Sequence, residues 1–360
     1  MLQLNQDSKL ANMGPPKRVL VTKLGHIGDV LVITPFLKVL KDIFPGVHTT
    51  VLVNQGTEEM VQGCKYADRV LLVKRGQRGL WQRMRDSLRL IGDLRREPLD
   101  ISFELSAGDR GSYLCRVAGA SLRIGYTSDN GHVRDRIFHE MLPRYEEGMH
   151  EVENFLRQLT IFQHSFDAPP LQWQPNSNAR QRAMGILQKH NLEKYILIHP
   201  TSRWMFKAWT PEKNAQVINH LNRKGWPVLL SAGPDNAEMD YIERLQEHLE
   251  PDGKVANLAG KLNLTLLGAL IEKATLFFGV DSAPMHMAAA VQTPTVVLFG
   301  PSGEHMWGPW QVKHKVLSGQ CPIRPCGRDG CNGSKICNSL VELPVSTVCQ
   351  AIDEMLPGVD

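Results

Sequence analysis

The sequence lacks a long hydrophobic run, and none of its apolar stretches approaches the roughly 18 residues that a membrane-spanning helix needs. Its first residues, MLQLNQDSKLANMGPPKR, contain no apolar segment of the kind found in a secretory signal peptide. These absences predict a cytoplasmic protein and leave peripheral attachment to a membrane surface open. We expect residues 1–16 to form a disordered leader before the first strand.

A dense basic arm and a stripe of interleaved aromatic residues are also missing. Aromatic residues make up 7% of the chain, and the formal net charge is only +4 over 360 residues. Binding to nucleic acid is therefore not predicted. The mild excess of positive charge suits an acidic small molecule or an anionic surface. The 42% hydrophobic content is typical of a soluble globular protein, and the length favours two domains.

Cysteine is sparse, but four of the seven residues cluster near the end of the chain. They follow the pattern C-x4-C-x4-C-x5-C and are Cys321, Cys326, Cys331 and Cys337. Zinc sites usually pair their ligands across two to four intervening residues, so this spacing fits a structural metal poorly. We therefore predict no metal site, and the role of the cluster stays open between thiols and metal ligands.

The chain does contain a regular alternation of short apolar strands with amphipathic helices. Strands are predicted over 18–24, 48–54, 69–74, 99–105, 195–200, 226–234, 275–280 and 294–300, and helices over 29–44, 79–97, 210–225, 236–250, 264–274 and 343–358. A stretch rich in Pro, Gln and Asn, 168–180, separates the two series and is typical of a linker. The pattern predicts an α/β protein with two Rossmann-like domains, 17–170 and 171–342, each with a parallel sheet, followed by a helix within 343–360.

In such domains ligands bind beyond the carboxyl ends of the strands, and the first strand is followed there by KLGHIGDVLVITP. Gly25 and Gly28 allow a tight turn or close approach to a ligand, but G-x-x-G alone does not predict a dinucleotide site. Asp29 has two interpretations, a helix N-cap or a carboxylate that faces a ligand.

Two further strand ends carry polar side chains. The segment HPTSRWMFKAWTPE offers Thr201, Ser202 and Lys207 as ligands for an anion, the alternative being a solvated loop over packed tryptophans. Glu238 lies one turn into the helix after the next strand, where a carboxylate commonly offsets the helix dipole.

The segment FFGVDSAPMHMAAAVQTPTVVLFG, residues 277–300, ends an apolar strand at Asp281 and begins a helix. The first amides of a helix lack internal partners and suit a phosphate, which the small residues Ser282 and Ala283 allow to approach. Asp281 suits a sugar hydroxyl better than a phosphate. The alternative is a capped, buried helix with His286 as a core imidazole.

The helix predicted over 79–97 combines an apolar stripe with many basic residues. The stripe consists of Leu80, Met84, Leu88, Ile91 and Leu94, and the basic residues of the stretch are Lys74, Arg75, Arg78, Arg83, Arg85, Arg89, Arg95 and Arg96. These charges have two interpretations, a solvated helix face or a surface that docks onto acceptor phosphates or an anionic leaflet.

Together, KLGHIGDVLVITPFLKVLK, HPTSRWMFKAWTPE and GVDSAPMHMAAAVQTPTVVLFGPS resemble glycosyltransferase family 9, the bacterial heptosyltransferases. The resemblance extends over about residues 17–356. Two further segments, GLWQRMRD and CPIRPCGRDGCNGSKICNSLVELP, look most like the subgroup that adds the third heptose of the lipopolysaccharide inner core.

The resemblance implies a GT-B fold, with two Rossmann-like domains facing across a cleft and a C-terminal helix crossing back to the first domain. It implies an inverting, metal-independent transfer of L-glycero-D-manno-heptose from ADP-heptose to a heptose of the lipopolysaccharide core, at the cytoplasmic face of the inner membrane. The chain has no D-x-D motif for a metal. The alternatives are heptosyltransferase I/II-type transfer, a nucleotide-sugar epimerase, or a non-catalytic sugar-nucleotide or lipopolysaccharide binding protein.

The resemblance also implies roles for individual residues. Asp29 corresponds to the general base, with Gly25, His26 and Gly28 on the acceptor side. On the donor side it implies Thr201, Ser202 and Lys207 at the phosphate, Glu238 at the ribose, Asp281 at the donor sugar, and the amides of Ser282, Ala283 and Met285 at the diphosphate, next to His286. Several relatives have D-T-G-L where this chain has D-S-A-P, so Pro284 removes one amide donor.

Overall fold

The chain folds into two compact units, residues Met1–Trp173 and Gln174–Asp360, in a computed structural model. The structure describes residues 14–76, 79–127, 136–146 and 148–357. Most of the expected leader, residues 1–13, and Arg78 therefore lie outside the described residues. The division between the units falls inside the predicted linker, 168–180, next to the expected boundary at 170.

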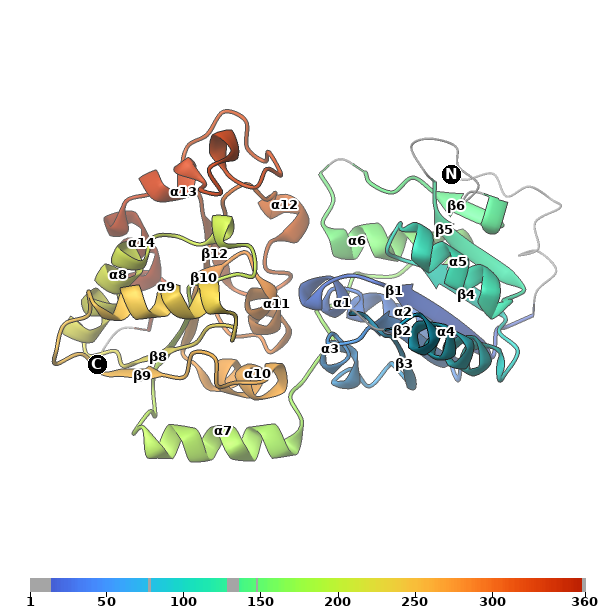
Figure 1. Cartoon of the computed structure of the whole chain (residues 1–360), viewed down its shortest axis with the longest axis horizontal. Helices are drawn as coiled ribbons and strands as arrows, with labels where there is room; N and C mark the ends of the chain where they lie inside the picture. Colours follow the sequence, from blue (N-terminus) through green and yellow to red (C-terminus); the bar gives the residue numbers. More distant parts are fainter. Residues whose placement is uncertain (1–13, 77–78, 128–135, 147, 358–360) are drawn as a thin grey trace. The chain divides into compact units, whose positions relative to one another are not determined.

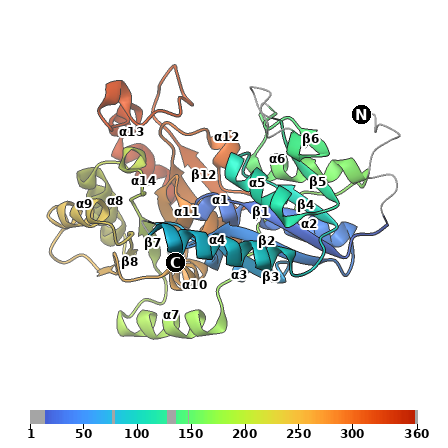
Figure 2. The ribbon, with the colours of Figure 1, turned by 45° about the vertical axis from the view of Figure 1, so that its right-hand side comes forward.

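The first unit contains a six-stranded sheet in which every paired strand is parallel to its neighbour, in the order β3-β2-β1-β4-β5-β6. The strands are β1 (Arg18–Lys23), β2 (His48–Asn54), β3 (Arg69–Val73), β4 (Ile101–Glu104), β5 (Leu122–Tyr126) and β6 (Glu140–Leu142). Helices cover both faces of the sheet (Figures 1 and 2). They are α1 (Ile27–Leu31), α2 (Thr34–Ile43), α3 (Glu59–Gln62), α4 (Leu80–Arg95), α5 (Asp109–Ala118), α6 (Glu151–Leu156) and the 3₁₀ segment η2 (Arg157–Phe162).

The second unit repeats this topology, with a parallel sheet in the order β12-β11-β10-β7-β8-β9. Its strands are β7 (Ile196–His199), β8 (Val228–Leu230), β9 (Val255–Asn257), β10 (Leu276–Val280), β11 (Thr295–Leu298) and β12 (His314–Leu317). Its helices are α7 (Ser177–Lys189), η3 (Met205–Lys207), α8 (Pro211–Arg223), α9 (Asn236–Gln246), α10 (Leu264–Lys273), α11 (Ala283–Ala290), α12 (Glu304–Trp307), η4 (Cys331–Gly333), α13 (Asn338–Glu342) and α14 (Val345–Asp353). The predicted α/β class with two Rossmann-like domains is confirmed.

In both sheets the strand order reverses between the first and the fourth strand of the unit. These are β1 and β4 in the first unit and β7 and β10 in the second. A crevice forms at such a switch point because the connections leave the two strands in opposite directions. The topology therefore marks one place in each unit where a ligand is expected.

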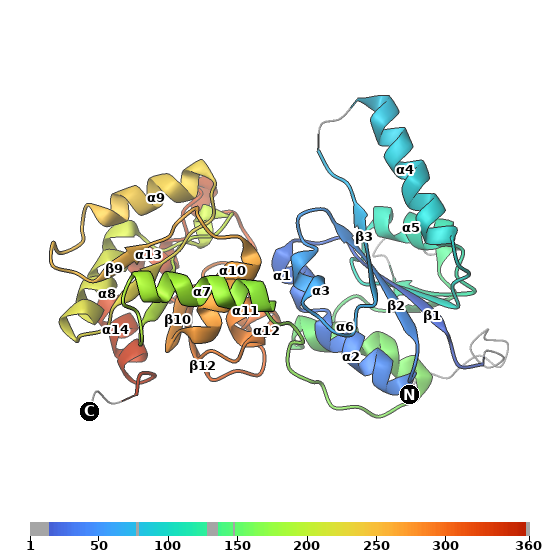
Figure 3. The same cartoon turned by 90° about the horizontal axis from the view of Figure 1, so that it is seen from below.

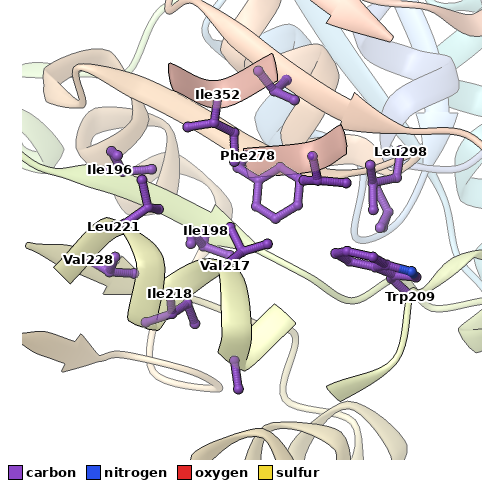
Figure 4. Close-up of a cluster of buried hydrophobic side chains, with 14 of the residues drawn as sticks. Ile196, Ile198, Trp209, Val217, Ile218, Leu221, Val228, Phe278, Leu298 and Ile352 are labelled. Carbon is purple, nitrogen blue, oxygen red and sulfur yellow. The ribbon is translucent and has the colours of Figure 1, made fainter. Parts of the chain in front are cut away.

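A core cluster of the second unit combines strand side chains with side chains of the helices α8, α9, α13 and α14, and Figure 4 shows part of it. Ile198 and Phe278 point from neighbouring strands toward Val217 of α8, and Ile352 of α14 closes the same cluster. The last helix therefore packs on the second unit, against α8, through buried side chains such as Val348. Its apolar face is buried in the core of its own unit. That the end of the chain also crosses back to the first domain stays a prediction.

The helix predicted over 29–44 is two helices, α1 and α2. Pro35 lacks the N–H that would reach the carbonyl of Leu31, so the helix cannot continue through this point. The Thr34 hydroxyl donates to the Leu31 carbonyl instead, at 2.8 Å. As a result α1 is a single short turn that follows the glycine loop.

The sequence did not predict the strands β5, β6, β9 and β12 or the helices α3, α5, α6, α7, α12 and α13. The strands β6 and β9 have three residues each, and α7 shows few apolar positions because only Ala179 and Ala183 are buried. Elements this short or this polar carry too little periodicity to be recognised without the sheet that they pack on.

Candidate functional site

The switch point of the first unit brings Lys23 and Glu104 to the ends of neighbouring strands. Thr22 of β1 pairs with Glu104 of β4, and both Lys23 and Glu104 are buried. The Lys23 ammonium donates to the Leu105 carbonyl at 3.0 Å and lies 4.3 Å from the centre of the Phe155 ring. These two contacts hold the buried lysine in place at the start of the glycine loop.

Asp29 lies in α1, close enough to this lysine for their charges to interact. Its carboxylate accepts a hydrogen bond from the backbone N–H of His26 at 2.6 Å, so Asp29 is the third helical residue and not the N-cap. A Cβ on Gly25 would lie 2.5 Å from the Asp29 Cβ, so only glycine allows this position. The Asn54 amide donates to the Gly25 carbonyl at 3.0 Å and holds the loop. The half-buried carboxylate is thus oriented before any substrate arrives.

The electrostatics of this cluster follow from burial. Burial lowers the pKa of Lys23, while the nearby charges of Asp29, Glu151 and Glu104 act in the opposite direction. Burial also raises the pKa of Glu104 to about 7 and raises the pKa of Glu151. The sequence analysis did not single out Lys23, Glu104 or Glu151, although a charged residue at the end of an apolar strand is a recognisable signal.

A Glu104→Gln variant is expected to change the pH dependence of stability. The folded pKa of Glu104, about 7, is above the usual 4.5, so the folded state retains a proton that the unfolded state loses within this window. The free energy of unfolding that this group contributes is present at low pH and falls as pH rises toward 7, by on the order of 3 kcal/mol.

Glutamine has no such titration, and its amide oxygen can still accept the N–H of Ser106, which Glu104 accepts at 2.9 Å. Urea unfolding between pH 5 and pH 8 should therefore show the variant gaining stability relative to the wild type. The matched control is Glu97→Gln, since Glu97 forms an exposed ion pair with Arg18. Equal pH dependence in wild type and Glu104→Gln would contradict the assignment.

The switch point of the second unit brings Lys207 and Asp281 together. Lys207 ends η3, which follows β7, and Asp281 follows β10. The ammonium and the carboxylate are 2.5 Å apart, with side chains only 13% and 8% exposed. The ammonium also lies 4.9 Å from the centre of the Trp204 ring. The alternative of a solvated loop is therefore wrong for Lys207.

Glu238 is a buried acceptor rather than a surface carboxylate at a helix start. One of its carboxylate oxygens accepts from the Thr201 hydroxyl at 2.5 Å and from the Gly233 amide at 2.8 Å. A Cβ on Gly233 would lie 2.4 Å from the other oxygen, so this glycine makes room for the carboxylate. Thr201 is fully buried and its proton is engaged here, and Ser202 accepts from the Trp204 amide at 3.3 Å. These hydroxyls shape the loop around Lys207.

The start of α11 offers two amides for an anion. Pro284 has no N–H, and the Met285 N–H donates to the Ser282 carbonyl at 3.1 Å. The N–H groups of Ser282 and Ala283 form no hydrogen bond within the described part of the chain, and both residues are half-buried, whereas Met285 is fully buried. The expected diphosphate site therefore has fewer free amide donors than the sequence predicted. These donors directly follow Asp281.

Two buried histidines lie on the elements that carry this site, α11 and β7. His286 is buried in α11, with its ring centre 6.4 Å from that of Trp307 in an edge-to-face arrangement. His199, which the sequence analysis did not single out, ends β7 and lies 3.0 Å from the Ser231 hydroxyl. Burial lowers the pKa of His199 to about 4, so this ring is neutral at physiological pH.

The described residues contain no candidate metal site. Nowhere among them are three or more His, Cys, Asp or Glu side chains grouped so that they could hold a metal ion. In the cysteine cluster, Cys337 is buried with its sulfur 3.2 Å from the Ser339 hydroxyl, and the Cys331 sulfur accepts from the Asn338 amide. The described helices are also too short or too polar to span a bilayer.

Comparison with known proteins shows the family of this chain. The model of glycosyltransferase family 9 (heptosyltransferase) matches residues 87–336. The chain is 30% identical to lipopolysaccharide heptosyltransferase 3 of Escherichia coli over 344 residues, which cover 92% of this chain and 97% of that one.

Solved structures share the fold. A family 9 glycosyltransferase from Veillonella parvula matches with a TM-score of 0.80 at 22% identity, covering 94% of this chain and 97% of that one. The E. coli heptosyltransferase WaaC with ADP matches with a TM-score of 0.74 at 20% identity, covering 94% and 99%. Two parallel six-stranded sheets of this topology and these neighbours show a GT-B fold, and the chain belongs to glycosyltransferase family 9, the heptosyltransferases.

Proposed function

We propose that this chain moves L-glycero-D-manno-heptose from ADP-heptose to a heptose of the lipopolysaccharide inner core, with inversion, and that it adds the third heptose. The 30% identity to lipopolysaccharide heptosyltransferase 3, over a region that covers 92% of the chain, supports the substrate and the subgroup. The observation that carries the proposal is the Lys207–Asp281 pair, which lies next to the two available amides of α11 at the switch point.

The second unit holds the donor in this proposal. The Lys207 ammonium and the amides of Ser282 and Ala283 bind the diphosphate, and they stabilise the negative charge that develops on ADP as it leaves. Asp281 is acidic and therefore contacts a hydroxyl of the sugar, while its bond to Lys207 fixes the direction of both side chains. Glu238, held by Thr201 and Gly233, is assigned to the ribose.

The first unit supplies the base. Displacement at an anomeric carbon passes through an oxocarbenium-like state, and the attacking hydroxyl must lose its proton. Asp29 accepts this proton, and its bond to the His26 amide keeps one carboxylate oxygen fixed. General base catalysis of this kind contributes about 10²–10⁴-fold. Gly25 makes room for the Asp29 side chain itself, and in this proposal the loop of Gly25, His26 and Gly28 lies on the acceptor side.

We propose that the reaction needs no metal. The charge on the leaving diphosphate is balanced in this scheme by Lys207 and the helix amides, so a cation is not required for that step. The acceptor is an anionic amphiphile anchored in a bilayer, and we therefore place the reaction at the cytoplasmic face of the inner membrane, with peripheral contact of the enzyme.

The test is incubation of the protein with ADP-heptose in the presence of EDTA, with and without truncated lipopolysaccharide acceptors. We expect one heptosyl residue to be added, detected by mass spectrometry, only to an acceptor that already carries the first two heptoses. Transfer to an acceptor with fewer heptoses would show I/II-type activity instead. Conversion of the sugar nucleotide without acceptor, or binding without turnover, would overturn the proposal.

A further inference from the structure

The helix α4 exposes an unusual amount of apolar surface. Four large apolar side chains are turned to solvent: Leu80 is 78% exposed, Trp81 80%, Met84 48% and Leu88 62%. With 3.6 residues per turn they fall within an arc of about 100°. No other helix among the described residues exposes more than one large apolar side chain. The four residues, here called the α4 stripe, therefore form a continuous outer seam.

The α4 stripe lies away from the side chains through which α4 packs on the first unit. Leu94 is buried, Leu90 packs against the same cluster, and the helix contacts α5 and β3. Its N-terminal half projects beyond the sheet of the first unit (Figure 3). A helix of a globular protein normally turns its apolar stripe to the core. The stripe predicted from the sequence is thus divided, with Leu94 in the core and Leu80, Met84 and Leu88 outside.

The charge around the α4 stripe is mostly positive. Residues 80–96 contain five arginines against two aspartates, in a chain whose net charge is +4, so most of that excess is concentrated here. Arg83, Arg85 and Arg89 are exposed and form no ion pair with any described residue. By helical spacing, Arg85 and Arg89 lie along one edge of the stripe. Tryptophan, leucine and unpaired arginine on one exposed face are the composition of an interfacial helix.

We propose that the α4 stripe docks this protein onto an anionic lipid surface. Leu80, Trp81, Met84 and Leu88 enter the boundary between headgroups and acyl chains, and Arg85 and Arg89 bind the lipid phosphates. A second copy of the chain is a poorer occupant, because it would bring the same arginines face to face. This inference names the surface for the membrane contact in the proposed function, but lipid binding is measured without any transfer reaction.

The test is flotation of the full chain with phosphatidylcholine vesicles, with or without phosphatidylglycerol and free of lipopolysaccharide. We expect binding to the anionic vesicles, weak binding to neutral ones, and loss of binding at high salt. The triple variant Leu80→Ser, Trp81→Ser, Leu88→Ser should lower the partition coefficient at least tenfold. Arg85→Gln with Arg89→Gln should lower it roughly tenfold on anionic vesicles only.

The matched control is Met184→Ser on α7, where a single exposed apolar residue is removed, and it should bind as the wild type does. All variants should keep the thermal midpoint of the wild type, because the altered side chains are exposed. Tryptophan fluorescence should shift to the blue with anionic vesicles, and the shift should be reduced in Trp81→Phe, which still floats.

Three outcomes would overturn this inference. The first is equal flotation of the triple variant and the wild type. The second is binding only when the vesicles contain the truncated glycolipid acceptor, which would assign the face to the acceptor. The third is self-association of the wild type that the triple variant abolishes, which would assign the face to a second copy. If transfer fails but flotation holds, the proposed function falls and the docking surface stands.

Discussion

An Asp29→Asn variant is expected to bind ADP as the wild type does and to lose about 10²–10⁴-fold of its turnover. The amide oxygen of asparagine can still accept the N–H of His26, the bond that Asp29 makes at 2.6 Å, so the turn of α1 is retained. The amide is not basic, and the acceptor hydroxyl keeps its proton. The measurements are ADP affinity by calorimetry and initial rates of heptose transfer.

The control for this change is Asp42→Asn on α2, which removes a carboxylate that only pairs with Lys38 on the surface. This variant should transfer heptose at the wild-type rate. Turnover by Asp29→Asn within tenfold of the wild type would show that another group takes the proton. A loss of ADP affinity in the same variant would place Asp29 at the donor instead.

The second large effect is expected for Lys207→Ala. Removing this ammonium takes away the one side-chain cation assigned to the leaving ADP, and loss of a single such donor costs about 10²–10³-fold in turnover. It also leaves the Asp281 carboxylate, which is 8% exposed, without its partner at the diphosphate. Affinity for ADP should therefore fall together with turnover.

A double-mutant cycle with Asp281→Ala tests this assignment further. Asp281→Ala alone should weaken the binding or positioning of ADP-heptose more than that of ADP, because its role is at the sugar. The two losses should not add, since the side chains are in direct contact. The control is Lys224→Ala, which breaks a 2.7 Å ion pair between the end of α8 and Asp353 of α14. Additive losses, or a Lys207→Ala variant that matches Lys224→Ala, would contradict the role of Lys207 at the leaving group.

Much of this protein follows from its sequence because the relevant signals are local. The alternation of apolar strands with helices predicted both parallel sheets, and parallel strands place the residues after their carboxyl ends at one edge. For that reason the sequence alone was enough to single out Asp29, Lys207 and Asp281. Where the local signal was misleading, as in the single helix predicted over 29–44, one proline decided the outcome.

The tertiary structure decided what depends on strand order and on which face is covered. It paired Lys207 with Asp281, buried Glu238 against Thr201, and placed Lys23 next to Glu104, since each pair joins segments far apart in the chain. It also turned the α4 stripe outward. Periodicity cannot reveal this, because the sequence pattern is the same whether the apolar face of a helix packs on the core or faces solvent. The sequence thus determined which groups stand at the strand ends. Only packing determined which of them meet, because contact depends on neighbours that the local pattern does not contain.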